Sequence, residues 1–220
     1  MIVFLGDSFT WGQGLQIPYW LEQGKSVDEI NELMPPNFPA EEYDYEADEL
    51  RKKQHFPNLV SKHFNKSYCT KWGNGGSNQD ILEIIKSMGN QMDTSGIDYF
   101  VIQFTEFTRD SNLDKLSPTT SFEQYREEIV KEIDKTIKNY YNKPWFGLSW
   151  RNDFGNILKL KYPKNHIPIQ FKNKVYSHFE PLLKNNSNLC LADTTKVRDG
   201  HFNSDGHQVV ADSIIKKIKH

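Results

Sequence analysis

A serine stands at the end of the first apolar run of the chain. Residues 1–5 are Met-Ile-Val-Phe-Leu, and Gly6, Asp7 and Ser8 follow directly. A continuous apolar run this short, closed by a glycine, favours a buried strand of a parallel sheet over a helix, which needs about ten or more residues of helical periodicity. Open α/β sheets bind their ligands at the carboxyl ends of the strands, so Ser8 is a candidate nucleophile. The alternative is an ordinary Gly-Asp-Ser turn after a strand.

A histidine and a carboxylate stand together near the other end of the chain. Asp199-Gly200-His201 precedes a run of apolar residues at helical spacing over residues 205–219. A serine hydroxyl is a weak nucleophile, so hydrolytic chemistry needs an imidazole to accept its proton and a carboxylate to hold the imidazole in the right tautomer. Asp199 and His201 can supply both groups. For His207 in the same segment, a structural role at the start of the helix is the better interpretation.

With both ends in view, the sequence resembles the SGNH/GDSL hydrolase superfamily. The first block of that family is a Gly-Asp-Ser at the end of strand one, which residues 6–8 match in full. Its last block is an Asp-x-x-His near the C-terminus, and Asp199-Gly200-His201 is one residue shorter. The resemblance implies that Ser8 is the nucleophile, that His201 is the general base and that Asp199 orients His201.

Residues 72–81, Trp-Gly-Asn-Gly-Gly-Ser-Asn-Gln-Asp-Ile, look like the second block of the family, in which a glycine N–H donates to the oxyanion. Gly76 is the first choice for that glycine, because only a residue without a Cβ lets the backbone come so close to a tetrahedral oxyanion. Asn78 is a further candidate for oxyanion or substrate binding. The alternative is a turn from strand to helix with Ser77 or Asn78 as N-cap. A phosphate-binding loop is discounted, since no Gly-Lys-Ser/Thr follows the glycines.

The third block is where the sequence departs from the family. The family pattern is Gly-x-Asn-Asp after strand three, whereas residues 103–106 are Gln-Phe-Thr-Glu. This alignment places Thr105 where the family asparagine gives an oxyanion hydrogen bond, and a hydroxyl can donate one. A displacement by one residue would place Glu106 there instead. Removing one oxyanion donor typically costs about 10²–10³ in rate, so the departure bears on the level of activity more than on the fold.

Short apolar runs alternate with helical patterns along the whole chain, which predicts an α/β fold. The resemblance implies the same architecture, a three-layer α/β/α sandwich with a parallel, flavodoxin-like sheet. We expect one domain over residues 1–220. The predicted strands are residues 1–5, 67–72, 98–104, 145–150 and 189–192. The predicted helices are residues 56–65, 78–88, 121–141, 172–184 and 205–219.

Two stretches interrupt this alternation. Residues 16–54, rich in Glu, Asp, Tyr and Pro, form an insertion between the first strand and its helix. A segment of this length beside the nucleophile predicts a lid, with short helices over residues 28–33 and 47–53. The alternative is a surface excursion without a role, since acidity alone is usually solvation. Residues 152–169 are predicted to be a linker that borders the strand ends.

Composition argues against several classes of partner. The net charge is −2 and no basic stripe is present, so nucleic acid is not an expected partner. No stretch approaches the roughly 18 apolar residues of a membrane span and no signal-peptide pattern precedes Gly6, so we expect a cytoplasmic protein without a membrane segment. The histidines lack metal-ligand spacing, so neither a metal nor another cofactor is expected. Cys69 and Cys190 are expected to be buried thiols.

These features lead to three functional hypotheses. The first is a serine ester hydrolase that acts through an acyl-serine on an oxygen ester of a carbohydrate or small molecule, an acetyl ester among them. The second is a carbohydrate O-acyltransferase that passes the acyl group to a sugar hydroxyl at the same Ser8, His201 and Asp199. The third is a catalytically inactive module that binds a glycan. Aromatic residues expected near the site could stack on a sugar or an acyl group, the alternative being core or half-buried surface; they are Trp11, Tyr19, Trp20, Tyr43, Tyr45 and Trp150.

Overall fold

The apolar run at the start of the chain forms strand β1 (Ile2–Gly6) inside a parallel sheet. The computed structural model describes residues 1–33, 44–72, 76–91, 94–110, 121–197 and 199–219. The other strands of the sheet are β2 (Tyr68–Trp72), β3 (Tyr99–Phe104) and β4 (Trp145–Ser149). They lie in the order β2-β1-β3-β4, and every neighbouring pair is parallel. Residues of β1 are buried throughout, as expected of a strand with a neighbour on each side and helices over both faces.

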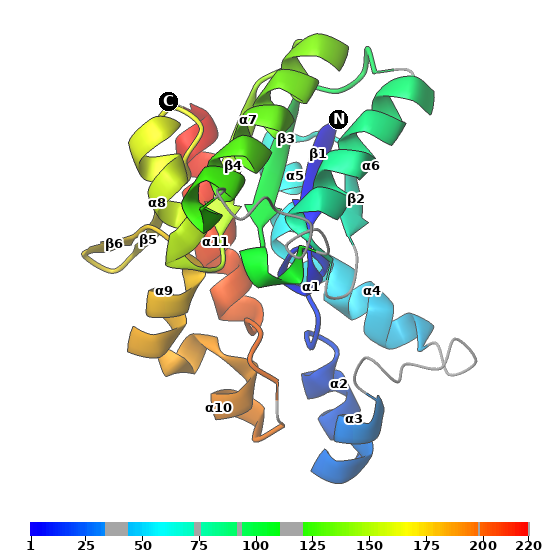
Figure 1. Ribbon diagram of the computed structural model, residues 1–220. Helices are drawn as coiled ribbons and strands as arrows, with labels where there is room; N and C mark the ends of the chain where they lie inside the picture. The colour runs from blue at the N-terminus through cyan, green and yellow to red at the C-terminus, as the bar shows by residue number, and fades with distance from the viewer. Residues whose placement is uncertain (34–43, 73–75, 92–93, 111–120, 198, 220) are drawn as a thin grey trace.

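Helices cover the two faces of the sheet and make three layers (Figure 1). The covering helices are α5 (Phe56–Phe64), α6 (Asn78–Gln91), α7 (Phe122–Tyr140), α8 (Asn152–Lys161) and α11 (Ser204–Lys219). Successive residues of a strand point to opposite faces. Ile2 and Phe4 therefore share one core with α5 and α11, and Val3 and Leu5 share the other with α6, α7 and α8.

This architecture confirms the predicted fold class, a three-layer α/β/α sandwich with a parallel sheet. Four predicted strands and four predicted helices are confirmed to within a few residues. They are the predictions over residues 1–5, 67–72, 98–104, 145–150, 56–65, 78–88, 121–141 and 205–219.

The order of the strands defines where a ligand can enter the sheet. The chain passes from β1 to β2 through α5 on one face, and from β2 to β3 through α6 on the other. It thereby moves to the opposite side of β1, so β1 and β3 are neighbours at a topological switch point. Ligands of open α/β sheets bind in the crevice beyond the carboxyl ends of the strands at such a point.

The predicted strand over residues 189–192 is wrong. The chain forms there a 3₁₀ turn, η4 (Ser187–Leu189), and a short helix, α10 (Leu191–Thr195). Cys190 forms an isolated bridge with Phe202, and the N–H of Leu191 donates to the carbonyl of His201 at 3.0 Å. The backbone of this apolar run therefore binds the loop of residues 201–202 and does not extend the sheet.

The predicted linker over residues 152–169 is also wrong in its first half, because α8 occupies residues 152–161. Phe154, Ile157 and Leu158 are spaced as on one helix face, and all three are buried. The second half of the segment then lies along β4, since the N–H of Ile167 donates to the carbonyl of Gly147 at 2.8 Å.

The predicted helix over residues 172–184 is shorter than expected. A small antiparallel hairpin of β5 (Ile169–Phe171) and β6 (Lys174–Tyr176) precedes it, and the helix is α9 (Phe179–Asn185). Lys172 at the turn of this hairpin has a φ of 52°. That left-handed conformation is incompatible with a helix over the same residues.

The described parts of the insertion over residues 16–54 are mostly helical. Its helices are α2 (Ile17–Glu22), α3 (Val27–Leu33) and α4 (Tyr45–Gln54), so the two short helices predicted for this segment are confirmed. Its acidic, proline-containing part, residues 34–43, lies outside the described residues. Ile17, Trp20 and Ile30 form a small apolar cluster with Leu191 and Val197. The insertion is therefore packed on the segment that leads to Asp199.

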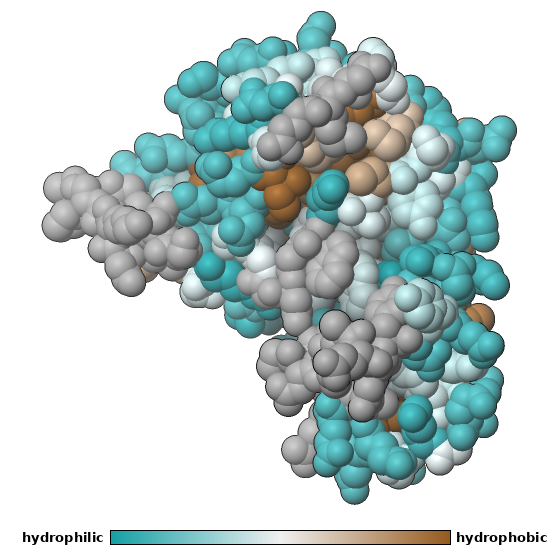
Figure 2. Space-filling model, turned by 90° about the vertical axis from the view of Figure 1, so that its right-hand side faces the viewer, coloured by the Kyte–Doolittle hydropathy of each residue, from teal (hydrophilic) through white to brown (hydrophobic). Residues whose placement is uncertain are grey.

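Polar and charged residues cover most of the side of the molecule that Figure 2 shows, and hydrophobic residues are seen over a limited area. The large hydrophobic side chains that the described residues expose are scattered over the chain, at Tyr45, Phe122, Tyr140, Leu160 and Val175. Isolated residues of this kind are normal on a protein surface. Among the described segments, no helix combines the length and the apolarity needed to span a bilayer.

Arg51 ties α4 to the turn that follows Ser8. Its guanidinium lies over the Trp11 ring, 4.1 Å from the centroid, and donates to the Trp11 carbonyl at 2.5 Å. Two further N–H groups of Arg51 donate to one oxygen of Asp48 at 2.8 and 2.5 Å. Both residues are buried, with Arg51 4% and Asp48 6% exposed. A buried charge is stable only with its partner in place, so this pair holds the insertion against the turn.

Replacing Arg51 by Met should lower the free energy of unfolding by about 3 kcal/mol, because the Asp48 carboxylate would stay buried with fewer partners. Lys52→Met is the matched control, since Lys52 is exposed and pairs with the same carboxylate at 2.8 Å. It should cost less than about 1 kcal/mol. Urea unfolding followed by circular dichroism measures both values, and equal losses in the two variants would contradict the anchoring role of Arg51.

Candidate active site

Ser8 is the first residue of α1 (Ser8–Trp11), a single helical turn that begins directly after β1. The Asp7 side chain caps this turn, because its Oδ1 accepts the N–H of Phe9 at 3.0 Å. The turn ends at Gly12, whose φ of 84° favours glycine and whose N–H donates to the Ser8 carbonyl at 3.0 Å. The strand and the two caps together hold Ser8 at the carboxyl end of β1.

Ser8, His201 and Asp199 form one hydrogen-bonded chain. The Ser8 Oγ lies 2.7 Å from the Nε2 of His201, and the Nδ1 of His201 lies 2.5 Å from the Oδ1 of Asp199. A carboxylate only accepts hydrogen bonds, so Nδ1 carries the proton and the lone pair of Nε2 faces the serine hydroxyl. The same Oδ1 accepts the backbone N–H of His201 at 2.8 Å, which holds the two residues in one tight turn.

The surroundings of the three residues restrict the imidazole ring. Asp199 and Ser8 are buried, whereas the side chain of His201 is 17% exposed. The Phe9 ring packs against the His201 ring at 4.4 Å between centroids, and against the Trp150 ring at the same distance on another side. The histidine is thus the member of the group through which solvent or a ligand has access, and Phe9 supports its orientation.

The loop that carries Asp199 and His201 is held in place by backbone hydrogen bonds and by a close contact with Gly14. The N–H of Ala192 donates to the carbonyl of Asp199 at 2.8 Å, and the N–H of Asn203 donates to the carbonyl of Leu189 at 2.9 Å. Gly14, with a φ of 86°, passes so near that a Cβ there would lie 2.8 Å from the Oδ2 of Asp199. This role of Gly14 was not predicted, because a glycine close after the serine is the only local signal for it.

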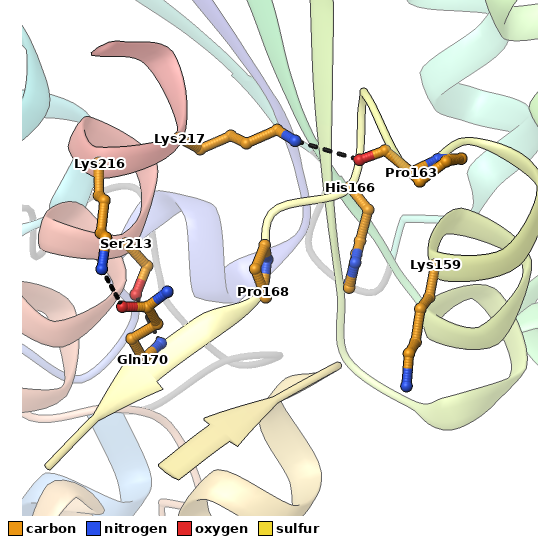
Figure 3. A pocket seen from close by; sticks show the side chains of 8 residues that line it. All are labelled: Lys159, Pro163, His166, Pro168, Gln170, Ser213, Lys216 and Lys217. Atoms are coloured by element: carbon orange, nitrogen blue, oxygen red, sulfur yellow. Dashed lines mark hydrogen bonds between the residues drawn. The ribbon is translucent and has the colours of Figure 1, made fainter. Parts of the chain in front are cut away.

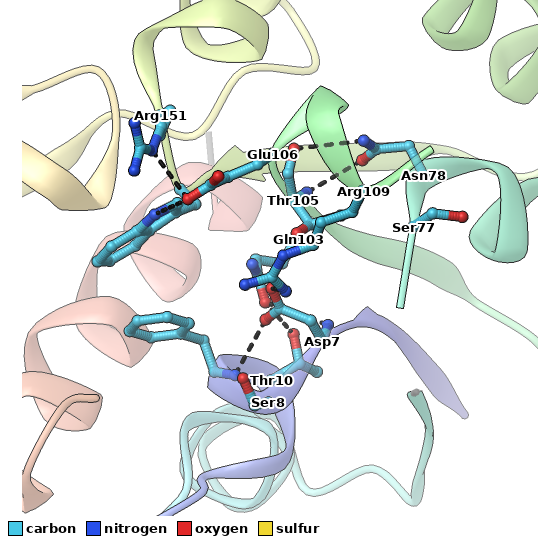
Figure 4. A network of polar contacts seen from close by, with 12 residues as sticks. Asp7, Ser8, Thr10, Ser77, Asn78, Gln103, Thr105, Glu106, Arg109 and Arg151 are labelled. Carbon is cyan, nitrogen blue, oxygen red and sulfur yellow. Dashed lines mark hydrogen bonds and ion pairs between the residues drawn. The ribbon is translucent and has the colours of Figure 1, made fainter. Parts of the chain in front are cut away.

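A polar network joins the end of β1 to the end of β3 (Figure 4). The Oε1 of Gln103 accepts the hydroxyl of Thr10 at 2.9 Å and the N–H of Asp7 at 3.4 Å. The Asp7 carboxylate pairs with Arg109 of η2 (Phe107–Arg109) at 3.2 Å. Gln103 and Arg109 were not predicted as site residues. A fully buried glutamine in an otherwise apolar strand was the signal that could have pointed to Gln103.

Asn78 joins the start of α6 to the end of β3. Its Oδ1 accepts the N–H of Thr105 at 3.0 Å, and its Nδ2 donates to the carbonyl of Thr105 at 3.3 Å. Its backbone N–H donates to the Oδ1 of Asp110 at 2.7 Å, and burial raises the pKa of that carboxyl group. Both ends of the Asn78 amide therefore have protein partners, as expected of a residue that positions its neighbours.

The alternative interpretation of this turn is also supported by its contacts. The Oγ of Ser77 accepts the N–H of Asp80 at 3.1 Å, while the Oδ2 of Asp80 accepts the N–H of Ser77 at 2.7 Å. These reciprocal bonds form a capping arrangement at the start of α6. Gly76, the predicted oxyanion donor, lies directly before it and is half-buried.

The two candidates of the third block have different surroundings. The Thr105 hydroxyl is buried, and no hydrogen-bond partner for it lies in the described part of the chain. The Oε1 of Glu106 accepts the Nε1–H of Trp150 at 3.0 Å and pairs with the Nε of Arg151 at 2.9 Å. Glu106 thus holds Trp150 beside Phe9, whereas Thr105 keeps an unused hydroxyl donor.

Within the described segments, no group of three or more His, Cys, Asp or Glu side chains is arranged to hold a metal ion.

This chain is similar to known proteins in its fold, as solved structures show, and not in its sequence. No protein-family model and no curated protein matches the chain. Among solved structures, a member of the lipolytic protein G-D-S-L family from Veillonella parvula matches with a TM-score of 0.51 at 12% identity, over 98% of this chain and 96% of that chain.

Two carbohydrate esterases of family 2 match as well, and both are longer than this chain. The enzyme from Clostridium thermocellum matches with a TM-score of 0.51 at 12% identity, over 99% of this chain and 62% of that chain. The enzyme from Corynascus thermopiles, which carries a carbohydrate-binding domain, matches with a TM-score of 0.51 at 15% identity, over 100% of this chain and 66% of that chain. Identities this low establish the fold alone, and on that basis this chain has a divergent SGNH/GDSL hydrolase-like fold.

Proposed function

We propose that this protein is a serine ester hydrolase in which Ser8 is the nucleophile, His201 the general base and Asp199 the residue that orients His201. The observation that carries the proposal is the 2.7 Å contact between the Ser8 Oγ and the His201 Nε2, continued at 2.5 Å to Asp199. A hydroxyl becomes an effective nucleophile when a positioned base removes its proton during the attack.

The reaction then follows from the positions of the three groups. The Ser8 Oγ attacks the carbonyl carbon of the ester while its proton passes to the His201 Nε2, and Asp199 stabilises the resulting imidazolium. Collapse of the tetrahedral intermediate breaks the bond to the alcohol oxygen, which takes the proton from His201. A water molecule, deprotonated by the same histidine, then attacks the carbonyl carbon of the acyl-serine. The bond to the Ser8 Oγ breaks, that oxygen takes the proton back from His201, and the acid is released.

The oxyanion of the tetrahedral intermediate needs hydrogen-bond donors near Ser8. The N–H of Ser8 is one candidate, because it starts α1 and no acceptor for it is found in the described residues. Gly76 supplies a second N–H at the switch point. Thr105 supplies the third donor, a proposal supported by its buried hydroxyl, which has no hydrogen-bond partner among the residues that the structure describes.

The substrate class is proposed to be an acyl ester, in particular an acetyl ester, of a carbohydrate or small molecule. Trp150 packs on Phe9, the residue that lies against His201, and its partly exposed ring offers an apolar surface on which a sugar or acyl group can pack. The matched solved structures include carbohydrate esterases, which is in keeping with this class. The insertion over residues 16–54 is proposed to act as a lid, since it packs on the segment that precedes Asp199.

His201, and not His207, is proposed as the base because the two residues have opposite surroundings. His207 is fully buried, and its Nδ1 accepts the N–H of Phe56 at 3.2 Å. Its ring stacks on the Phe56 ring at 5.7 Å and meets the Phe202 ring edge-on at 5.9 Å. Burial holds the pKa of His207 well below its usual value, so it stays neutral and packs α11 on α5.

Ser8→Ala should remove covalent labelling by a fluorophosphonate and lower kcat for p-nitrophenyl acetate by roughly 10⁶-fold, because the members of such a group act as a unit. His201→Ala should be nearly as severe. Ser67→Ala is the matched control, since Ser67 is an exposed loop serine outside the site, and it should keep full labelling. Labelling of Ser8→Ala at the wild-type rate would refute the proposal.

His207→Asn should change the pH dependence of stability. Below pH 6.5 the unfolded chain binds a proton at this residue and the folded chain does not. Well below pH 6.5, the free energy of unfolding therefore decreases by about 1.4 kcal/mol for each unit by which the pH is lowered, from this residue alone. Asparagine keeps an acceptor near the position of Nδ1 but does not titrate. Urea unfolding between about pH 5 and pH 6.5 should show an average slope smaller by about 1 kcal/mol per unit in the variant, because the unfolded chain is only partly protonated near pH 6.5. An unchanged slope would contradict the neutral state of His207.

Thr105→Val should lower kcat by about 10²-fold if the hydroxyl donates to the oxyanion, because the bond strengthens only as charge develops on the oxygen. KM should change much less. Thr105→Ser keeps the hydroxyl and is the matched control, so it should retain most of the activity. Steady-state kinetics on p-nitrophenyl acetate distinguish the outcomes, and a silent Thr105→Val would leave the backbone amides as the sole proposed donors.

A further inference from the structure

A cavity of about 290 Å³ lies away from Ser8, between α8, the hairpin strand β5 and α11 (Figure 3). None of Ser8, His201 and Asp199 lines it. All the titratable side chains that line the cavity are basic, namely Lys159, His166, Lys216 and Lys217. They come from α8, from the segment beside β4 and from the last turns of α11, so the tertiary structure brings them together.

The lysines of this cavity have neutral partners. The Nζ of Lys217 donates to the carbonyl of Pro163 at 3.1 Å, and the Nζ of Lys216 donates to the Oε1 of Gln170 at 2.6 Å. Across the described residues, Lys159, Lys216 and Lys217 form no ion pair with a carboxylate. An ammonium has three N–H donors, so donors and positive charge both remain available in the cavity.

Some lysines elsewhere in the chain do pair with carboxylates, as Lys66 does with Asp98 at 2.8 Å and Lys138 with Asp134 at 2.7 Å. An anion that entered this cavity would meet lysines without such a partner among the described residues, so it would not have to displace a carboxylate. Lys217 is half-buried, and burial lowers the pKa of its ammonium group, which an anion beside it would reverse.

Two further side chains present fixed polar groups at the cavity. The Nε2 of His166 lies 3.1 Å from the carbonyl oxygen of Ser177. A carbonyl oxygen can only accept, so Nε2 donates and the ring is held in one orientation. His166 is 6% exposed. The Oε1 of Gln170 is occupied by Lys216, which can only donate, so the Nε2 of Gln170 is the free end of the amide. Gln170 adds neutral N–H donors to those of the lysines.

The walls are not polar throughout. Pro163 and Pro168 line the cavity together with the imidazole of His166. Ligand pockets commonly combine apolar walls with a few fixed polar groups that orient the ligand. A cavity of this volume has room for an organic body in addition to one anionic group.

We propose that this cavity binds a small phosphomonoester, with its phosphate oxygens on the ammonium groups of Lys159, Lys216 and Lys217 and its organic body against Pro163 and Pro168. Lysine ammonium groups act as point charges toward phosphate, and several of them around one dianion suit its multiple oxygens better than a carboxylate. The site is separate from the proposed ester chemistry and does not depend on it.

Titration calorimetry on the whole chain tests the proposal with four probes: phenyl phosphate, inorganic phosphate, benzoate and phenol. Phenyl phosphate should bind most tightly, inorganic phosphate more weakly because it lacks the apolar body, benzoate more weakly because it carries a single charge, and phenol not at all. The affinity for phenyl phosphate should fall as salt is added, since charge dominates the binding.

The double variant Lys216→Gln/Lys217→Gln should lose affinity for phenyl phosphate by about tenfold or more, because each charge-assisted hydrogen bond contributes at least that much. Lys62→Gln/Lys131→Gln is the matched control, since it removes the same charge from two exposed lysines outside the cavity. It should bind phenyl phosphate like the wild type. Equal losses in both double variants, or unchanged binding in the first, would overturn the proposal, as would binding of phenol as tight as that of phenyl phosphate.

Discussion

The parallel pairing of β1 with β2 on one side and with β3 on the other is the constraint on which the rest of the structure depends. It brings the carboxyl ends of β1 and β3 to one edge, where the chain has crossed from one face of the sheet to the other. Ser8 follows β1 there, and the loop of His201 reaches it from 193 residues away. This order of strands brings Ser8 to the edge of the sheet that the loop of His201 reaches.

Buried polar groups hold the loops beyond that edge. Gln103 joins β3 to the turn of Ser8 through Asp7 and Thr10, and Asn78 joins the start of α6 to the end of β3. A buried polar group without a partner is costly, so each of these contacts restricts two loops at once. The turn of Ser8 is thereby tied to the end of β3, and fixed positions of this kind are what the proposed reaction requires.

A small number of contacts also links the surroundings of Ser8 to more distant parts of the molecule. The insertion is fastened to the turn of Ser8 by Arg51 and to the segment before Asp199 by an apolar cluster. Helix α11 begins just after the loop of His201, and its last turns carry Lys216 and Lys217 into the basic cavity. Helix α11 therefore connects the loop of His201 with the basic cavity.

Local patterns in the sequence were sufficient for much of this protein. The apolar run of residues 1–5, its closing glycine and the Asp-x-His spacing are short-range features, so they predicted the first strand, Ser8 at its end and the pairing of Asp199 with His201. The three-layer fold followed from the alternation of strand and helix patterns, together with the family resemblance. Residues 189–192 were misassigned because an apolar run of four residues suits a strand and a short helix equally.

Only the tertiary structure decided which distant polar groups meet. Gln103 lies 96 residues from Asp7, and the lysines of the basic cavity come from separate helices. Periodicity records which side of an element faces the core, because burial repeats with the geometry of the helix or strand. The order of the strands and the path of the loops determine which polar groups become neighbours. No short stretch of sequence predicts either of them.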